Sequence, residues 1–168
     1  MIVVADATPL RYLTLIEAVD ILPTLYERIL IPQTVADELQ RPRTPLPVRQ
    51  WMATPPAWLA IRHAPLTSEP ALSRLGAGER EAIALAQALH AELLVMDDWD
   101  GRAAALQCGL TVLGTLGVLD EAAARRLIEL PEALTRLRAT NFRMPPEIVE
   151  MLLARDAARR QQHETRSS

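Results

Sequence analysis

The chain has 168 residues, 49% hydrophobic and 23% charged, a balance typical of one soluble domain long enough to bury a core. Its formal net charge is −3, so nucleic-acid binding would have to come from local basic patches and not from the field of the whole molecule. All 18 basic residues are arginine, which excludes chemistry that needs a lysine, such as a P-loop or a Schiff base. We expect a cytoplasmic protein without a membrane span, because Cys108 is the single cysteine and Asp6 interrupts the first apolar run.

The predicted elements begin with an apolar run at residues 2–5, rich in β-branched side chains, which favours a strand buried on both faces of a parallel sheet. Asp6 ends this run. Thr8 suits a helix N-cap and Pro9 suits the first helical position, so we expect a helix to start there. Ligands of open α/β sheets bind beyond the carboxyl ends of strands, so Asp6 is either a site residue or a cap for the turn.

A second apolar run at residues 28–31 predicts another strand, and a helix is expected over residues 33–40. On a helical wheel, Val35 and Leu39 mark the buried face of this helix. Glu38 flanks that face, so its carboxylate can face a cleft.

Residues 41–70 hold seven of the 13 prolines in the chain. We interpret this segment as an elaborated connection within one domain, because neither flank carries enough apolar residues for a second core. It includes a predicted short helix at residues 48–52 and a predicted third strand at residues 59–62.

The longest amphipathic helix is expected to open at residues 76–79. Glu79 and Glu81 flank opposite sides of its apolar stripe, so helical geometry leaves both of them open as site residues. The two glycines before this helix are too few and wrongly spaced for a dinucleotide-binding fingerprint.

A fourth strand over residues 92–96 runs directly into the pair Asp97 and Asp98. A helix over residues 100–107 and a fifth strand over residues 110–113 are expected to follow. Prolines then punctuate further helices in the last third of the chain.

Five short strands that alternate with helices predict an α/β fold with a central, mostly parallel sheet covered by helices on both faces. We expect one domain over residues 1–155 and a polar tail at residues 156–168 that frays. The carboxyl ends of parallel strands share one edge of a sheet, so the acids that follow the strands should meet there. Carboxylates at such close range would repel one another strongly unless a cation neutralises them.

A cluster of carboxylates without a nearby histidine or cysteine suits a hard cation such as Mg²⁺ or Mn²⁺ and disfavours zinc. Such ions can activate water and stabilise the charge on a phosphoryl group that is being cut. Hydrolysis of a phosphodiester bond is therefore the reaction that we expect.

Five short motifs occur in order along the chain: Asp6 with Thr8, the VADEL segment ending at Leu39, GEREAI at 78–83, LVMDD at 94–98 and GTLG at 114–117. Together they resemble the PIN-domain family, and most closely the bacterial and archaeal subgroup related to VapC-type toxins of toxin–antitoxin pairs. The resemblance covers about residues 1–155 and implies the three-layer α/β/α PIN-like fold.

The resemblance implies an Mg²⁺- or Mn²⁺-dependent endoribonuclease, the toxin of a type II toxin–antitoxin pair. It implies that the catalytic acids, which also hold the metal, are Asp6, Glu38, Glu81 and Asp98. Asp97 joins them as a possible metal ligand, since the doubled aspartate leaves the register open by one residue, and Glu79 stays open beside Glu81.

Three residues are candidate contacts to RNA. Thr8 matches a small hydroxyl residue that accompanies the first acid of the family. Arg11 and Arg102 are close to the acids in sequence and suit phosphate, although a solvated surface arginine is the alternative for each. Trp99 beside the aspartates could either stack on a base or be buried against the following helix.

The implied partners are an RNA substrate, a cognate antitoxin protein and a second copy of the chain. The main alternative function is a non-catalytic PIN-like module that binds another protein. Receiver domains and haloacid-type phosphatases also place aspartates at strand ends, but both normally employ a lysine, which this chain lacks.

Overall fold

The computed structural model describes all residues, 1–168, and divides into two compact units. The N-terminal unit is Met1–Thr115 and the C-terminal unit is Leu116–Ser168. All of the strands belong to the N-terminal unit, and the C-terminal unit is helical.

The strands form one all-parallel, five-stranded sheet in the order β3-β2-β1-β4-β5. Their bounds are β1 (Val3–Ala5), β2 (Ile29–Pro32), β3 (Leu59–Arg62), β4 (Leu93–Val95) and β5 (Val112–Leu113). Central β1 is paired on both sides, with Val3 opposite Ile29 of β2 and Val4 opposite Leu94 of β4. The predicted α/β class with a parallel sheet of about five strands is confirmed.

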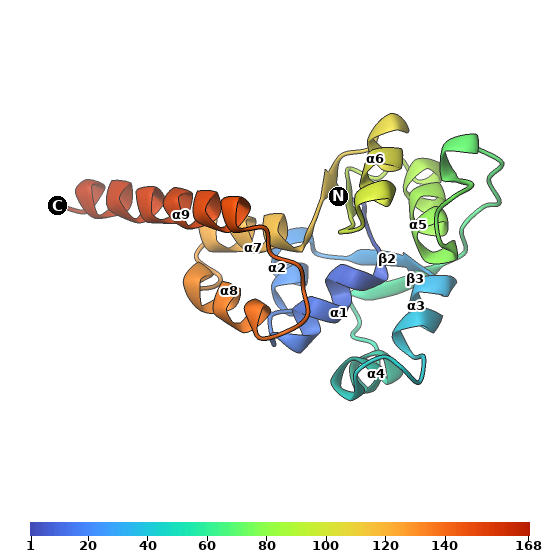
Figure 1. Cartoon of the computed structure of the whole chain (residues 1–168), viewed down its shortest axis with the longest axis horizontal. Helices are drawn as coiled ribbons and strands as arrows, with labels where there is room; N and C mark the ends of the chain where they lie inside the picture. Colours follow the sequence, from blue (N-terminus) through green and yellow to red (C-terminus); the bar gives the residue numbers. More distant parts are fainter. The chain divides into compact units, whose positions relative to one another are not determined.

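The helices of the N-terminal unit connect these strands. They are α1 (Ala7–Leu15), α2 (Ile21–Tyr26), α3 (Gln33–Leu39), α4 (Leu46–Ala53), the 3-10 turn η1 (Pro70–Leu72), α5 (Ala77–Ala88) and α6 (Trp99–Gln107). Figure 1 shows α5 and α6 on one side of the strands and α1, α3 and α4 on the other. The unit therefore has the three layers α/β/α.

The direction of the connections reverses once in the sheet. From β1 the chain moves outward to β2 and β3, and then it returns to β4 and moves outward to β5 on the opposite side. Right-handed crossovers in opposite directions place their helices on opposite faces, which accounts for the two helical layers. The reversal makes the carboxyl ends of β1 and β4 a topological switch point, the position where open α/β sheets bind ligands.

The core forms because the strands are apolar on both faces. All three residues of β1 are buried, and the side chains of Ile29, Ile31 and Leu94 are fully enclosed. Residues 41–70 belong to this unit as well, since they supply α4 and the edge strand β3. Trp51 and Trp58 pack together there, with ring centroids 6.0 Å apart.

One local expectation, the start of the first helix, differs from the structure. Helix α1 begins at Ala7 with Asp6 at its N-cap position, and not at a Thr8 cap. The reason is that the backbone turns directly at the end of β1, where the Asp6 N–H donates to the Val95 carbonyl of β4. The Asp6 side chain makes no capping hydrogen bond to α1, and the backbone donor that acts on its carboxylate is the adjacent Ala7 N–H.

The C-terminal unit contains α7 (Thr115–Ala124), whose first residue closes the N-terminal unit, α8 (Leu130–Arg138) and α9 (Pro146–Arg166). Residues 156–166, which we expected to fray, continue α9. Asp156 is buried and accepts hydrogen bonds or ion pairs from Arg159 and Arg160, which supports the helix one turn further on. None of the helices in the chain is both long and apolar enough to span a membrane.

Replacement of a central strand residue should show how much the sheet depends on its apolar packing. Leu94→Ala should lower the free energy of unfolding by about 2–5 kcal/mol, because the fully buried side chain leaves a cavity. Leu66→Ala is the matched control, because Leu66 is fully exposed and its truncation should change the free energy by less than about 0.5 kcal/mol. Urea denaturation measures both, and equal effects would contradict the assigned core.

Candidate active site

Two aspartates lie at the switch point of the sheet. Asp6 follows β1 directly, and Asp97 follows β4 after one residue. The hydrogen bond from the Asp6 N–H to the Val95 carbonyl, 2.9 Å long, ties the ends of the two strands together. Asp6 is only 3% exposed, so its carboxylate lies within the protein and close to the charge of Asp97.

Glu38 of α3 reaches the same place through a gap left by a glycine. A Cβ atom placed on Gly78, in the first turn of α5, would lie 3.0 Å from Glu38 Oε2 and 3.6 Å from Asp6 Oδ1. The two carboxylate oxygens therefore border the same small space beside Gly78. A larger residue at position 78 would push against Glu38, so the missing side chain is what lets these two acids meet.

Glu79 is the third acid of this group. Its carboxylate accepts a 2.7 Å hydrogen bond from the Gly76 N–H, which fixes it at the start of α5. Burial and the charges of Asp98 and Glu38 raise the pKa of Glu79 above its ordinary value. The structure thus places Glu79 among the acids of the switch point, a position that helical geometry alone left open between Glu79 and Glu81.

Glu81 has a different environment. Its Oε2 accepts a 2.6 Å hydrogen bond from the hydroxyl of Thr34 in α3. Neither Asp6 nor Glu79 has its pKa altered by the charge of Glu81. Glu81 is therefore tied to α3 one turn before Glu38, while no charge of Glu81 acts on Asp6 or Glu79.

The two adjacent aspartates have separate partners. Asp97 accepts hydrogen bonds from the backbone N–H of Thr115, at 2.7 Å, and from its hydroxyl, at 2.6 Å. Asp98 is the N-cap of α6 and accepts a 2.8 Å bond from the Gly101 N–H. Thr115 belongs to the GTLG motif and follows β5 after one residue. A hydroxyl residue in that motif is the feature of the sequence from which this contact could have been predicted.

Arg102 of α6 approaches Asp97 through a second glycine gap. A Cβ atom on Gly114 would lie 2.8 Å from Arg102 Nη1 and 2.9 Å from Asp97 Oδ1. Burial raises the pKa of Asp97, while the Thr115 hydrogen bonds and the Arg102 charge oppose that rise. Arg102 therefore already neutralises part of the acidic group.

The other expected RNA contacts lie on α1 and α6. Thr8 is partly exposed on the first turn of α1. Arg11 lies one turn further on, and its Nε is buried without a hydrogen-bond partner. Trp99 is 84% exposed at the start of α6, so it is not buried against that helix.

Asp6 has the strongest electrostatic perturbation in the group. Burial is the main cause that raises its pKa to about 7, and the charges of Glu79, Glu38 and Asp97 add to the rise. A hydrogen bond from the Ala7 N–H opposes it. At pH 7 the Asp6 carboxylate is therefore only partly ionised.

The donor set fits a hard divalent cation in its chemistry. The side-chain oxygens that gather here belong to carboxylates and a hydroxyl, the ligands that Mg²⁺ and Mn²⁺ prefer, and the Arg102 guanidinium lies beside one of them, Asp97. No group of three or more acidic, histidine or cysteine side chains is arranged to hold a metal ion as it stands. The carboxylates would have to turn toward an ion, and the space beside Gly78 is where Asp6 and Glu38 can do so.

Comparison with known families agrees with this geometry. A family model described as PIN domain matches residues 2–157. The chain belongs to the PIN-domain family. PIN domains are generally nucleases, and this finding confirms the resemblance to the PIN-domain family that the sequence motifs indicated. No curated protein and no solved structure matches the chain.

The raised pKa of Asp6 should make the stability of this PIN domain depend on pH. The unfolded chain loses the Asp6 proton near the ordinary pKa of 3.8, whereas the folded protein keeps it up to about pH 7. The free energy of unfolding contributed by Asp6 should therefore fall as pH rises between these values, by at most about 4 kcal/mol at about 1.4 kcal/mol per pKa unit.

Asp6→Asn should remove this contribution, so the variant should be more stable than the wild type at pH 8 and similar to it at pH 4. Urea denaturation in the presence of EDTA measures the difference. A difference between the two proteins that stays constant from pH 4 to pH 8 would contradict the assigned pKa.

Proposed function

We propose that this PIN domain is an Mg²⁺- or Mn²⁺-dependent endoribonuclease. The observation that carries the proposal is the approach of Asp6 and Glu38 to one space beside Gly78, at the topological switch point of the sheet. Membership of a generally nucleolytic family supports hydrolysis of a nucleic acid. RNA as the substrate rests on the resemblance to VapC-like ribonucleases.

The proposed metal-holding residues are Asp6 and Glu38, with Asp97 and Glu79 as the nearest further carboxylates. When bound, the ion would activate a water molecule and offset the charge that develops on the phosphate. Thr115 positions Asp97 through two hydrogen bonds, so it acts on the site through that aspartate. Asp98 caps α6 and its charge reaches Glu79, so its role as a further catalytic acid stays a prediction.

Binding of the RNA backbone at this site would depend on arginine. Arg11 on α1 is a candidate, because its side chain is only partly buried and a guanidinium matches the oxygen atoms of a phosphate. Arg102 stands beside Asp97, where it can contact a phosphate and still balance that carboxylate. Thr8 offers a hydroxyl two residues after Asp6.

The biological role that we propose is that of a toxin in a type II toxin–antitoxin pair, active in the cytoplasm and forming a homodimer. This role rests on the VapC-like resemblance of the sequence motifs. A cognate antitoxin would have to cover the acids or supply a cation to them. Expression of the chain in a host with and without the adjacent gene tests the role, because only a toxin should arrest growth when its partner is missing.

Loss of either proposed metal ligand should abolish metal-dependent cleavage. Asp6→Asn and Glu38→Gln should each lower the rate of RNA cleavage by more than about 100-fold, since residues that only orient a ligand typically cost roughly 10- to 100-fold. Asp37→Asn is the matched control, because Asp37 neighbours Glu38 on α3 but is exposed and bonded to Gln33. Cleavage of labelled RNA with Mn²⁺ or with EDTA is the measurement.

Calorimetric titration with Mn²⁺ separates the enzyme from the alternative, a non-catalytic PIN-like module. The wild type should bind the ion and Asp6→Asn should not. Equal binding by both proteins, or cleavage at the wild-type rate in both variants, would remove the proposed site. An intact fold without metal binding would favour the protein-binding module.

The choice between the two glutamates of α5 can be settled with a matched pair. Glu79→Gln should lower cleavage by about tenfold or more, because Glu79 is a nearby carboxylate that can join Asp6 and Glu38 in holding the ion. Glu81→Gln should change the rate by less than about threefold, because the amide can keep the hydrogen bond to Thr34. A larger loss of cleavage in Glu81→Gln than in Glu79→Gln would identify Glu81 as the site residue.

A further inference from the structure

The arginines are not matched to the acids equally in the two units. The N-terminal unit carries nine arginines against 13 acidic residues, whereas the C-terminal unit carries nine arginines against eight. The formal charge is therefore −4 in the unit that contains the candidate active site and +1 in the unit that does not. The net charge of the first unit repels a polyanion, whereas that of the second unit weakly attracts one.

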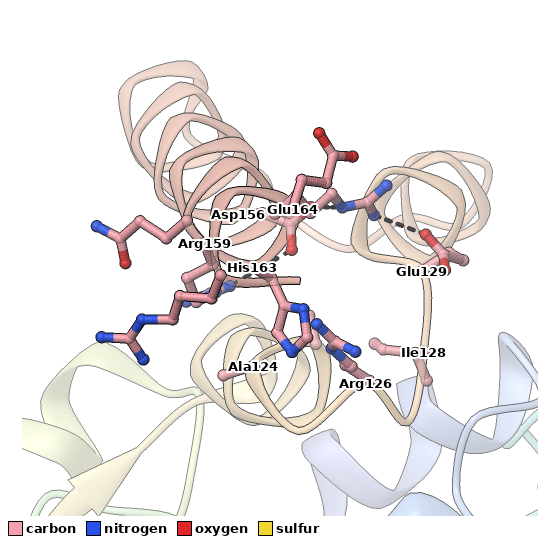
Figure 2. A pocket seen from close by; sticks show the side chains of 12 residues that line it. Ala124, Arg126, Ile128, Glu129, Asp156, Arg159, His163 and Glu164 are labelled. Carbon is pink, nitrogen blue, oxygen red and sulfur yellow. Dashed lines mark hydrogen bonds and ion pairs between the residues drawn. The ribbon is translucent and has the colours of Figure 1, made fainter. Parts of the chain in front are cut away.

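The C-terminal unit has a pocket of about 490 Å³ between the end of α7, the start of α8 and the last turns of α9. Figure 2 shows this pocket, with Arg126 and Ile128 after α7, Glu129 before α8, and Arg159 and His163 on α9. Two more arginines of α9, Arg160 and Arg166, also line it. Four guanidinium groups thus surround one space, together with the carboxylates of Glu129, Asp156 and Glu164, so the arginines exceed the acids by one.

Two of these arginines are held in place by acids. Arg159 Nη2 contacts Asp120 Oδ1 at 2.7 Å, and its Nε is buried without a hydrogen-bond partner. Arg160 contacts Glu129 at 2.6 Å and the buried Asp156 at 3.0 Å. These ion pairs occupy only part of the five N–H donors on each guanidinium, and they order the side chains before any ligand arrives.

The other two arginines have no side-chain partner. Arg126 and Arg166 are exposed, and neither makes an ion pair or a side-chain hydrogen bond. Arg126 also adopts a left-handed backbone conformation, with φ +62°, where α7 ends. Glycine adopts a left-handed conformation with less strain than other residues. Arginine at this position therefore lowers the stability of the fold slightly.

We propose that this pocket, formed by Arg126, Arg159, Arg160 and Arg166, binds the phosphate backbone of single-stranded RNA. The planar guanidinium fork matches the oxygen atoms of a phosphate, and the two unpartnered arginines can release counterions from RNA when they bind. The choice of RNA rests on the proposed nuclease function. An acidic segment of a protein partner is the competing occupant, and the experiment below separates the two.

The test uses the full chain carrying Asp6→Asn, which keeps RNA intact if the nuclease proposal is right. Fluorescence anisotropy of a short labelled RNA strand gives the dissociation constant across a series of NaCl concentrations. Adding Arg126→Gln and Arg166→Gln should weaken binding at low salt by about tenfold or more. It should also reduce the slope of log K against log salt by about 1.4, or 0.7 for each phosphate contact that is lost.

Arg138→Gln with Arg143→Gln is the matched control. Both residues are exposed, lie in the same unit, carry the same charge and stay outside the pocket. The control should change binding by less than about threefold. Thermal unfolding of each variant checks that the fold is kept, since none of the four substituted side chains holds another residue in place.

Three results would overturn the proposal. Equal weakening by the pocket pair and the control pair would mean that only the overall charge matters. No binding of RNA by the full chain would remove the ligand altogether. Binding of a polyglutamate peptide that depends on Arg126 and Arg166, while RNA binding does not, would assign the pocket to an acidic protein partner.

These outcomes are distinct from failure of the nuclease proposal. If the protein is not a nuclease, Asp6→Asn leaves any cleavage unchanged, but RNA binding by the C-terminal unit can still be measured. If the pocket does not bind RNA, cleavage can still depend on Asp6 and the binding constants of the two arginine pairs will agree.

Discussion

The burial of the Asp6 carboxylate among neighbouring acids at the switch point is the constraint on which the N-terminal unit depends. The reversal of crossover direction between β1 and β4 forces Asp6 and Asp97 to the same edge of the sheet. Burial then removes the water that would otherwise screen them. Such an arrangement costs stability in the absence of a cation.

Small residues and hydrogen bonds make this close approach possible. Gly78 leaves room for Glu38 beside Asp6, and Gly114 leaves room for Arg102 beside Asp97. Thr115 holds Asp97 through two hydrogen bonds, so this carboxylate keeps a fixed orientation despite its like-charged neighbours. Preorganisation of this kind places the cost of assembling the acids in folding rather than in the binding of a substrate.

Arginine has two different roles in the two units of this chain. Within the acidic site, Arg102 balances the Asp97 carboxylate. In the C-terminal unit, ion pairs to Asp120 and Asp156 fix guanidinium groups that line a pocket. The unit that contains the candidate active site carries a formal charge of −4, whereas the unit that contains this pocket carries +1.

The sequence by itself determined the order and type of the main elements and the acids that follow the strands. Apolar runs such as 2–5 and turn residues such as Asp6 are local signals, and they act over a few residues of the chain. The tertiary structure alone decided which acids meet. Glu79 and Glu81 are equivalent on a helical wheel, and only packing against α3 gives Glu81 to Thr34 and leaves Glu79 near Asp6. Contacts of that kind depend on segments far apart in sequence, which no local pattern encodes.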